Sequence, residues 1–432
     1  MGYRISTPIN VMFAEAGEPI SHVRNKLLAD KFSLKLISLQ DHPLQDKLCA
    51  LKVEATSKNQ LQTYREKYTL LDSFITQFYT KRRKIALSEQ PLPYSFEYST
   101  VINPFTDNIE FYSSSRIANP PSSESILFQE YLEKFKNENY TEFYTDGSKT
   151  EKNNYSGLAI YSPSLDIEEK YKISKSASIF TTEAVAIHET VKKILKIGIE
   201  KSVIFTDSLS VLTAIKKYSP VKSKNINYII LEIKKNLKRI EEQQKTIKLI
   251  WVPAHKGIIG NEKVHNLAKE ASSSGIQLNI KLPYTDLFEE LKRESNYRSE
   301  KILKEIGKTK GKKFFDKFYS PTRKPWFYKI ISSRYHIVTI NRLRANHYNL
   351  SESLHRKNMV ISPRCECGYL EEDYEHIILD FPKYNIQRNT LFKKFKKANK
   401  LQEIKINIEE ILKEPTTLKS KRKKRKRKKK LK

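Results

Sequence analysis

The sequence predicts an α/β fold, with a mixed sheet that carries helices between residues 141 and 275. Three observations support this: a run of short β-like segments, helical stretches that alternate with later strands, and turn residues between them. The strand-like runs are 143–145, 158–161, 169–173, 203–206 and 247–251, and the helical stretches are 181–197, from 207 onward, 225–240 and 261–271. The resulting order β-β-β-α-β-α-α-β-α is that of a mixed sheet with helices packed on it.

Each element has its own local signal. Phe143-Tyr144-Thr145 runs into Asp146-Gly147, a common turn dipeptide, and the next two runs continue a meander. Thr181-Thr182 offers an N-cap for the helix that follows. Val203-Ile204-Phe205-Thr206 has the continuous apolar character of a buried strand, and 247–251 ends the strand series before a last helix.

The rest of the chain divides by composition. Residues 1–90 place apolar residues at helical spacing, and a proline- and serine-rich stretch at 91–138 is expected to be a linker. The α/β domain is expected over 139–276, followed by a mostly helical region over 283–415. Like charges dominate residues 416–432, so this tail is expected to be disordered.

The chain is strongly basic. Its 80 Lys and Arg residues exceed its 49 Asp and Glu residues, which gives a net charge of +31. Twelve of the last fourteen residues are Lys or Arg, yet the other 418 residues still carry +19. The excess predicts a polyanionic partner, and the tail predicts nuclear import, a nucleic-acid arm or merely a solubilising extension.

Other function classes are less compatible with the composition. Three Cys cannot form a disulfide framework, so an intracellular compartment is expected, the nucleus or otherwise the cytoplasm. No apolar run approaches the ~20 residues of a membrane-spanning helix, and the N-terminus lacks the apolar core of a signal peptide. The sequence carries no signal for an oligomeric state.

Three acidic residues occupy places where ligands commonly bind. Asp146 ends the first strand, Glu183 lies in the first turn of a helix, and Asp207 ends the fourth strand. Each alone has an ordinary explanation as a turn residue, a complement to the helix dipole or an N-cap. Together their carboxylates would repel one another, and Mg²⁺ or Mn²⁺ is the expected neutraliser because hard cations select oxygen ligands.

Four motifs in order resemble type 1 ribonuclease H, in the variant carried by insect-type non-LTR retrotransposons. The motifs are Tyr144-Thr145-Asp146-Gly147-Ser148, Thr182-Glu183-Ala184, Phe205-Thr206-Asp207-Ser208 and the segment from Trp251 to Glu262. The resemblance covers about residues 141–275. It implies a five-stranded mixed sheet and an endonuclease that cuts the RNA strand of RNA–DNA hybrids with two divalent cations about 4 Å apart.

The resemblance also implies roles for single residues. Asp146, Glu183 and Asp207 match three of the family's four metal-binding acids, and His255 matches its catalytic loop histidine. His265 stands where the fourth acid is expected. Imidazole ligates Mn²⁺ or Zn²⁺ but is a poor ligand for Mg²⁺. The domain is therefore expected to be a weakened or Mn²⁺-favouring enzyme, with a silent nucleic-acid-binding protein or an inert remnant as the alternatives.

A basic helix and both flanks extend this interpretation. Lys234, Lys235, Lys238 and Arg239 are expected either to follow a duplex backbone or to form a solvated helix face. Residues 7–19 resemble the segment after the polymerase thumb of such retroelements.

The C-terminal region resembles a Cys/His knuckle of the same elements. Cys365, Cys367 and His376 are its candidate zinc ligands, while Phe381 stands where the last Cys is expected and Asp380 is an imperfect substitute. Because a structural zinc needs four ligands, a metal-free loop is the favoured expectation. The third cysteine, Cys49, has an apolar helical context that predicts a buried core thiol.

Overall fold

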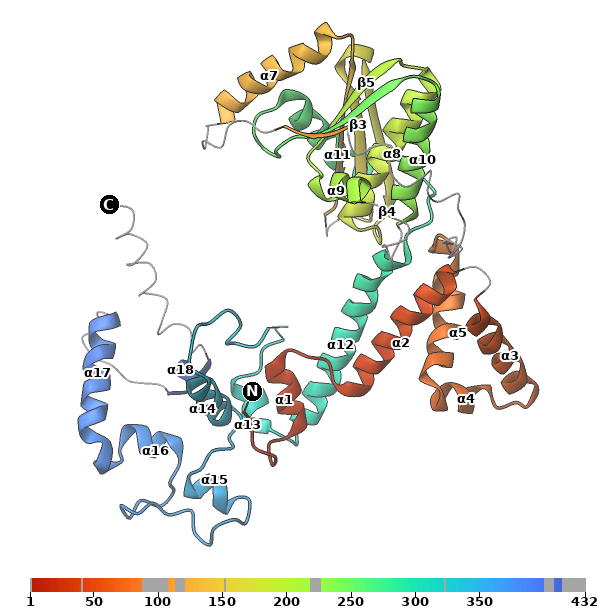
Figure 1. The fold of residues 1–432 in the computed structure, drawn as a ribbon. Coiled ribbons are helices and arrows are strands. Elements are labelled where there is room, and N and C mark those ends of the chain that lie inside the picture. Colours follow the sequence, from red (N-terminus) through yellow and green to blue (C-terminus); the bar gives the residue numbers. More distant parts are fainter. Residues whose placement is uncertain are drawn as a thin grey trace. The chain divides into compact units, whose positions relative to one another are not determined.

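The computed structural model divides the chain into two compact units, residues 26–292 and residues 1–25 with 293–432 (Figure 1). The described residues are 2–39, 42–87, 108–112, 121–150, 153–217, 227–321, 324–399 and 408–413. The tail predicted over residues 416–432 lies outside the described residues. No helix in the described part of the chain is long and apolar enough to cross a membrane.

A mixed sheet forms the centre of the first unit. Its strands are β1 (Ile109–Phe111), β2 (Thr141–Ser148), β3 (Tyr155–Ser162), β4 (Ile167–Ser174), β5 (Lys201–Thr206), β6 (Thr246–Trp251) and β7 (Ile276–Gln277). They are arranged in the order β1-β6-β5-β2-β3-β4-β7. β3 is antiparallel to both β2 and β4, whereas β2, β5, β6 and β1 run parallel to one another.

Helices cover both faces of this sheet. They are α7 (Pro121–Asn137), α8 (Ile179–Ile197), α9 (Leu209–Lys217), α10 (Tyr228–Glu242) and α11 (Ile259–Ser274). Successive strand residues point to opposite faces. Phe143 and Ile204 therefore belong to the core under α8, α9 and α10, while Tyr144 and Phe205 belong to the core under α7 and α11. The predicted α/β fold, a mixed sheet packed with helices, is confirmed.

Two elements fall inside the stretch that the sequence analysis assigned to a linker. β1 pairs with β6 and forms one edge of the sheet, and together with β7 at the other edge it extends the expected five strands to seven. α7 buries Phe128, Leu132 and Phe135, which lie on one helix face at spacings of four and three. Pro120 precedes this helix in the sequence and Pro121 is its first residue, and because those prolines indicated a linker, the helix was not predicted.

The first helix of the domain begins earlier than predicted. Its N-cap is Ser178, whose side chain accepts a hydrogen bond from the backbone N–H of Thr181. Thr181 and Thr182, the predicted caps, are fully buried inside the first turns. The longer helix places Glu183 in its second turn.

The N- and C-terminal regions are helical, as predicted. Their helices are α1 (Ile9–Ala16), α2 (Ser21–Ser38), α3 (Pro43–Ser57), α4 (Leu61–Lys67), α5 (Thr69–Lys81), α12 (Phe288–Gly307), α13 (Lys312–Lys317), α14 (Arg334–Arg344), α15 (Ser351–His355), α16 (Tyr374–Leu379), α17 (Asn385–Asn399) and α18 (Ile408–Lys413). Cys49 on α3 is exposed, so the prediction of a buried thiol was wrong. Only Leu48 and Ala55 are buried on that helix, a narrow stripe that leaves the neighbouring position in solvent.

A buried ion pair organises the unit formed by the two ends of the chain. Arg344 on α14 and Glu15 on α1 have side chains that are only 6% and 2% exposed, and Arg344 Nε lies 2.9 Å from Glu15 Oε1. The same guanidinium donates to the backbone oxygens of Leu412 (2.6 Å) and Phe318 (3.1 Å). Arg344 thus links four segments that are distant in sequence. The carboxylate of Glu15 balances its charge, and buried backbone oxygens accept its other hydrogen bonds.

Replacing Arg344 with Met should destabilise this unit by about 3–5 kcal/mol, because the change leaves Glu15 buried without its counter-charge. Denaturation followed by Trp326 fluorescence in a Trp251→Phe background measures the loss. The control is Arg24→Met, whose exposed pair with Glu18 should contribute less than about 1 kcal/mol. Equal effects of the two changes would show that the buried pair has no special weight.

Candidate active site

Two acidic residues lie side by side because of the register of two parallel strands. Thr145 of β2 pairs with Thr206 of β5, so Asp146 and Asp207 follow at the same edge of the sheet. Asp146 is still within β2 and is 5% exposed, whereas Asp207 begins the turn after β5. The carboxyl ends of parallel strands form the edge at which α/β sheets bind ligands.

The third acid reaches this edge from a helix. Glu183 lies on α8, which packs closely against β2 at Gly147. A Cβ at residue 147 would stand only 2.9 Å from the backbone nitrogen of Glu183, so the contact requires glycine. As a result, carboxylate oxygens of Asp146, Glu183 and Asp207 all lie within 4.8 Å of one another.

The gathered negative charge changes the pKa values of two of these groups. Burial raises the pKa of Glu183 from 4.5 to about 7, and the charges of Asp207 and Asp146 add to this rise against a hydrogen bond from Ser208. The pKa of Asp207 is also raised, first by burial and then by Asp146. Glu183 and Asp207 therefore resist ionisation, and a bound cation would favour their ionised forms.

Polar neighbours hold two of the carboxylates in place. The hydroxyl of Ser208 donates to Glu183, and the side chain of Asn261 donates to Asp207. Trp251 Nε1 donates to the backbone oxygen of Asp207 at 3.1 Å. Neither Ser208 nor Asn261 was expected from the sequence to have a role at this site. Ser208 could have been found because it directly follows Asp207. Asn261 could have been found because it lies four residues before His265 on the same predicted helix.

His265 lies directly beside the acidic cluster. Its Nδ1 is 2.7 Å from Asp146 Oδ2, and its side chain is 21% exposed. α11 places His265 one turn after Asn261, so both side chains face the same strand edge. Residue 265, where an acid was expected from the sequence, thus places an imidazole nitrogen against a carboxylate oxygen of Asp146.

His255 lies in the loop before α11. Its backbone φ of 56° is in the left-handed region, and its side chain is 69% exposed. Its ring centroid is 4.9 Å from that of His265, in an edge-to-face arrangement. The structure thus brings all five predicted site residues together at one edge, with the loop histidine outermost and in solvent.

The donor set fits a divalent cation of the hard class. Three carboxylates supply only oxygen donors, which Mg²⁺ and Mn²⁺ prefer. Burial is the main cause of the raised pKa of Glu183, and a bound cation would favour the ionised form by offsetting the added charges of Asp207 and Asp146. His265 is not part of this group of oxygen donors, and its Nδ1 lies within hydrogen-bond distance of Asp146.

The basic helix fits the expectation for a binding surface only in part. Lys234 on α10 is 5% exposed, so it is a core residue rather than a surface contact. Its position places it on the buried face together with Ile233 and Leu237. Lys235 is exposed but pairs with Glu232 on its own helix.

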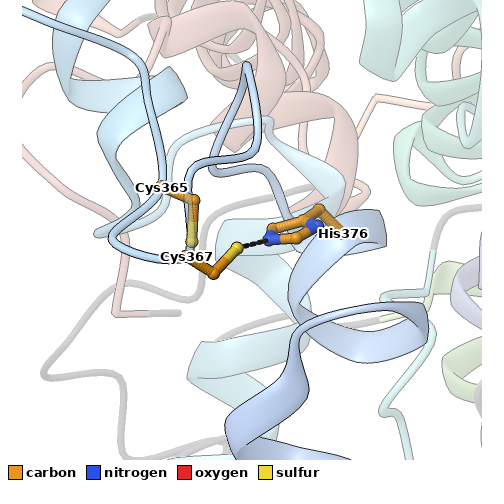
Figure 2. A group of neighbouring side chains, drawn as sticks. All are labelled: Cys365, Cys367 and His376. Atoms are coloured by element: carbon orange, nitrogen blue, oxygen red, sulfur yellow. Dashed lines mark hydrogen bonds between the residues drawn. The ribbon is translucent and has the colours of Figure 1, made fainter.

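A second group of potential metal ligands lies in the C-terminal region (Figure 2). Donor atoms of Cys365, Cys367 and His376 lie within 4.8 Å of one another. Asp380, the proposed substitute ligand, is exposed and is not part of the group, so that expectation was wrong. It ends α16 as the C-cap, and the next residue, Phe381, turns inward instead.

Comparison with known proteins agrees with the geometry of the sheet edge. Residues 138–273 match the RNase H family model, and this range contains all five residues of the candidate site. A search of curated proteins found no match.

A divalent cation should stabilise the protein more at high than at low pH. Without a cation, the folded state binds more protons than the unfolded state between pH 4.5 and about 7, so the free energy of unfolding falls as pH rises through this window. A cation binds the ionised carboxylates. At 100 times its Kd it adds about 2.7 kcal/mol, a rise of several degrees in Tm.

The measurement is the change in Tm on adding Mg²⁺ or Mn²⁺ at about pH 8 and at about pH 5. Glu183→Gln serves as the reference, because it removes the titrating group and should flatten the pH dependence. An equal Tm shift at both pH values would contradict the assignment of Glu183 to the cation site.

Proposed function

We propose that the RNase H domain at residues 138–273 is an endonuclease that cuts the RNA strand of RNA–DNA hybrids. An RNase H domain implies a nucleic-acid substrate, and membership of the family suggests a nuclease. The observation that carries the proposal is the convergence of Asp146, Glu183 and Asp207, whose carboxylate oxygens lie within 4.8 Å of one another.

The three carboxylates would hold the divalent cations. Bound cations supply an activated water and neutralise the charge that develops on the leaving 3′ oxygen. The backbone fixes the positions of these ligands before substrate arrives, since Asp146 lies in a central strand and Gly147 holds α8 against it. Ser208 and Asn261 keep two of the carboxylates oriented, which is the usual work of groups behind a ligand.

The two histidines would have different roles. His265 would contribute a nitrogen ligand in the fourth position, and this lowers the negative charge of the site by one relative to an acid. Mn²⁺ should then support activity better than Mg²⁺. His255 is exposed at the rim, and an imidazole can take up or release a proton near neutral pH. It would move protons at the reacting groups or assist departure of the product.

Two general features favour a hybrid duplex as the substrate. The net charge of +31 favours association with phosphate backbones through counterion release. Selection of the RNA strand would rest on contacts to its 2′-hydroxyl groups, which DNA lacks.

A second candidate is a nucleic-acid-binding protein without catalysis. The hydrogen bond between His265 and Asp146, at 2.7 Å, favours it, because the imidazole engages an oxygen that would otherwise ligate a cation. A protonated His265 would also supply internally part of the positive charge that a cation provides. This form would keep the fold and the basic surface while losing hydrolysis.

We further infer an origin in a non-LTR retrotransposon polyprotein and import into the nucleus. The motifs in residues 7–19, the RNase H segment and the Cys/His segment stand in the order found in such elements. The twelve basic residues at the C-terminus support nuclear import. Fusion of residues 416–432 to a fluorescent protein, compared with a fusion in which these Lys and Arg are neutral, tests the second inference.

Cleavage of a labelled RNA–DNA hybrid tests the main proposal. The protein should cut the RNA strand with Mn²⁺ and more slowly with Mg²⁺, and Asp146→Asn should reduce the rate by roughly 100-fold or more. His265→Asp should raise the rate with Mg²⁺ by roughly 10-fold, because it restores an oxygen ligand and a negative charge.

A matched control is Asp166→Asn, which removes an exposed acid in the turn between β3 and β4. It lies beyond Ser162, the last residue of β3, whereas Asp146 pairs with Ala159 inside that strand, so the change should leave the rate unchanged. Failure of the protein and of His265→Asp to cut with either cation, together with salt-sensitive binding of the hybrid, would favour the second candidate.

A further inference from the structure

The loop at residues 363–372 is built to hold two cysteine side chains on one side of a tight turn. The N–H of Gly368 donates to the carbonyl of Cys365 at 3.0 Å, and the N–H of Cys365 donates to the carbonyl of Tyr369 at 3.0 Å. Gly368 has φ 89°, a conformation that a side chain would strain. The turn therefore brings Cys367, two residues after Cys365, back beside it.

A helix supplies the third side chain. His376 lies in the first turn of α16, where its backbone N–H donates to the N-cap residue Asp373 at 2.8 Å. The ring of Tyr369 stacks on the imidazole with centroids 4.2 Å apart and planes at 1°. Tyr369 thus links the turn and the imidazole, since its backbone oxygen also accepts from Cys365.

The imidazole is buried and points at the thiols. His376 is 4% exposed, and its Nε2 lies 3.3 Å from Cys367 Sγ (Figure 2). Its other nitrogen, Nδ1, has no hydrogen-bond partner among the described residues. A polar side chain buried this deeply needs a strong partner to offset its desolvation. The two thiols, weak hydrogen-bonding groups, provide little compensation by themselves.

The spacing of the donor atoms matches that of a tetrahedral metal site. With Zn–S bonds of about 2.3 Å and Zn–N bonds of about 2.0–2.1 Å, neighbouring donors of a tetrahedron stand roughly 3.5–3.8 Å apart. The sulfur atoms and the imidazole nitrogen here lie within 4.8 Å of one another, with one pair at 3.3 Å. These separations are close to those that a single tetrahedral ion requires.

We propose that Cys365, Cys367 and His376 bind a zinc ion through three protein ligands, with water in the fourth position. Two thiolates and an imidazole select zinc over the hard cations Mg²⁺ and Ca²⁺. Binding releases the two thiol protons, so affinity rises with pH. This inference is independent of hydrolysis by the RNase H domain.

The fourth ligand position of this site has no protein donor, because Phe381 stands where a cysteine was expected and its side chain cannot bind a metal. Phe381 is 5% exposed, and its ring lies 5.8 Å from that of His376. No further Cys, His or carboxylate joins the three donors within the described ranges. A site that lacks one ligand binds zinc more weakly than a closed one and leaves the ion accessible to an added ligand. A metal-free loop was expected from the sequence because only three of the four ligands of a closed zinc site are present; the proposed site differs in that water fills the fourth position.

Zinc content of the full-length protein, purified under reducing conditions, tests the proposal. All proteins in this test carry Asp146→Asn, which weakens the acidic site as a second place for the ion. The protein with this change alone, the parent, should hold one zinc per chain. When Co²⁺ replaces the zinc, the parent should show the absorption of a tetrahedral ion bound by thiolates. Cys367→Ser should lower zinc affinity by at least about 10-fold, while Cys49→Ser, an exposed thiol elsewhere, should not change it.

Cys367 is exposed, so its replacement by Ser should leave the loop folded, and far-UV circular dichroism of the metal-free proteins checks this. A parent with no bound zinc, or equal zinc content in the parent and in Cys367→Ser, would overturn the proposal. Zinc bound without the thiolate absorption of Co²⁺ would also overturn it, because it would place the ion on other ligands.

Discussion

The convergence of three carboxylates at one end of the sheet is the constraint on which the RNase H domain depends. Burial raises the pKa of Glu183 to about 7, and the negative charges of Asp207 and Asp146 add to the rise, so keeping this group ionised opposes folding. The backbone imposes the arrangement, through the pairing of Thr145 with Thr206 and the close approach of α8 at Gly147. The side chains cannot separate without breaking the central strand pair or that helix contact, so either protonation or a bound cation must relieve the repulsion.

The sheet can carry this local strain because both of its faces are packed. Alternate residues of β2 and β5 enter separate cores, and each core is completed by its own helices. Helix α11 both packs against the sheet and contributes to the acidic edge. Val264 and Ala268 fill one core, while Asn261 and His265 face the acidic edge. An acid replaced by histidine on this helix therefore alters the charge of the site without altering the core that positions it.

Periodicity in the sequence predicted the elements that build the sheet edge, and the motif positions predicted which side chains meet there. Two kinds of feature escaped it. β1 and α7 were missed because flanking prolines signal a linker, whereas their stability comes from the open edge of β6 and an apolar surface of the sheet. Lys234 and Cys49 were misplaced because burial at a single helix position depends on what packs against it, which composition around the residue does not specify.

The two candidate metal sites differ in the chemistry of their donors, and this difference keeps their ions apart. Oxygen donors at Asp146, Glu183 and Asp207 favour hard cations, whereas sulfur and nitrogen at Cys367 and His376 favour zinc. His265 brings an imidazole to the margin of the oxygen site, 2.7 Å from Asp146. As a ligand it would shift the preference of that site from Mg²⁺ toward Mn²⁺ and, further along the same series, toward zinc. Under the proposed function, the identity of residue 265 would therefore set how selectively the acidic site chooses its ion.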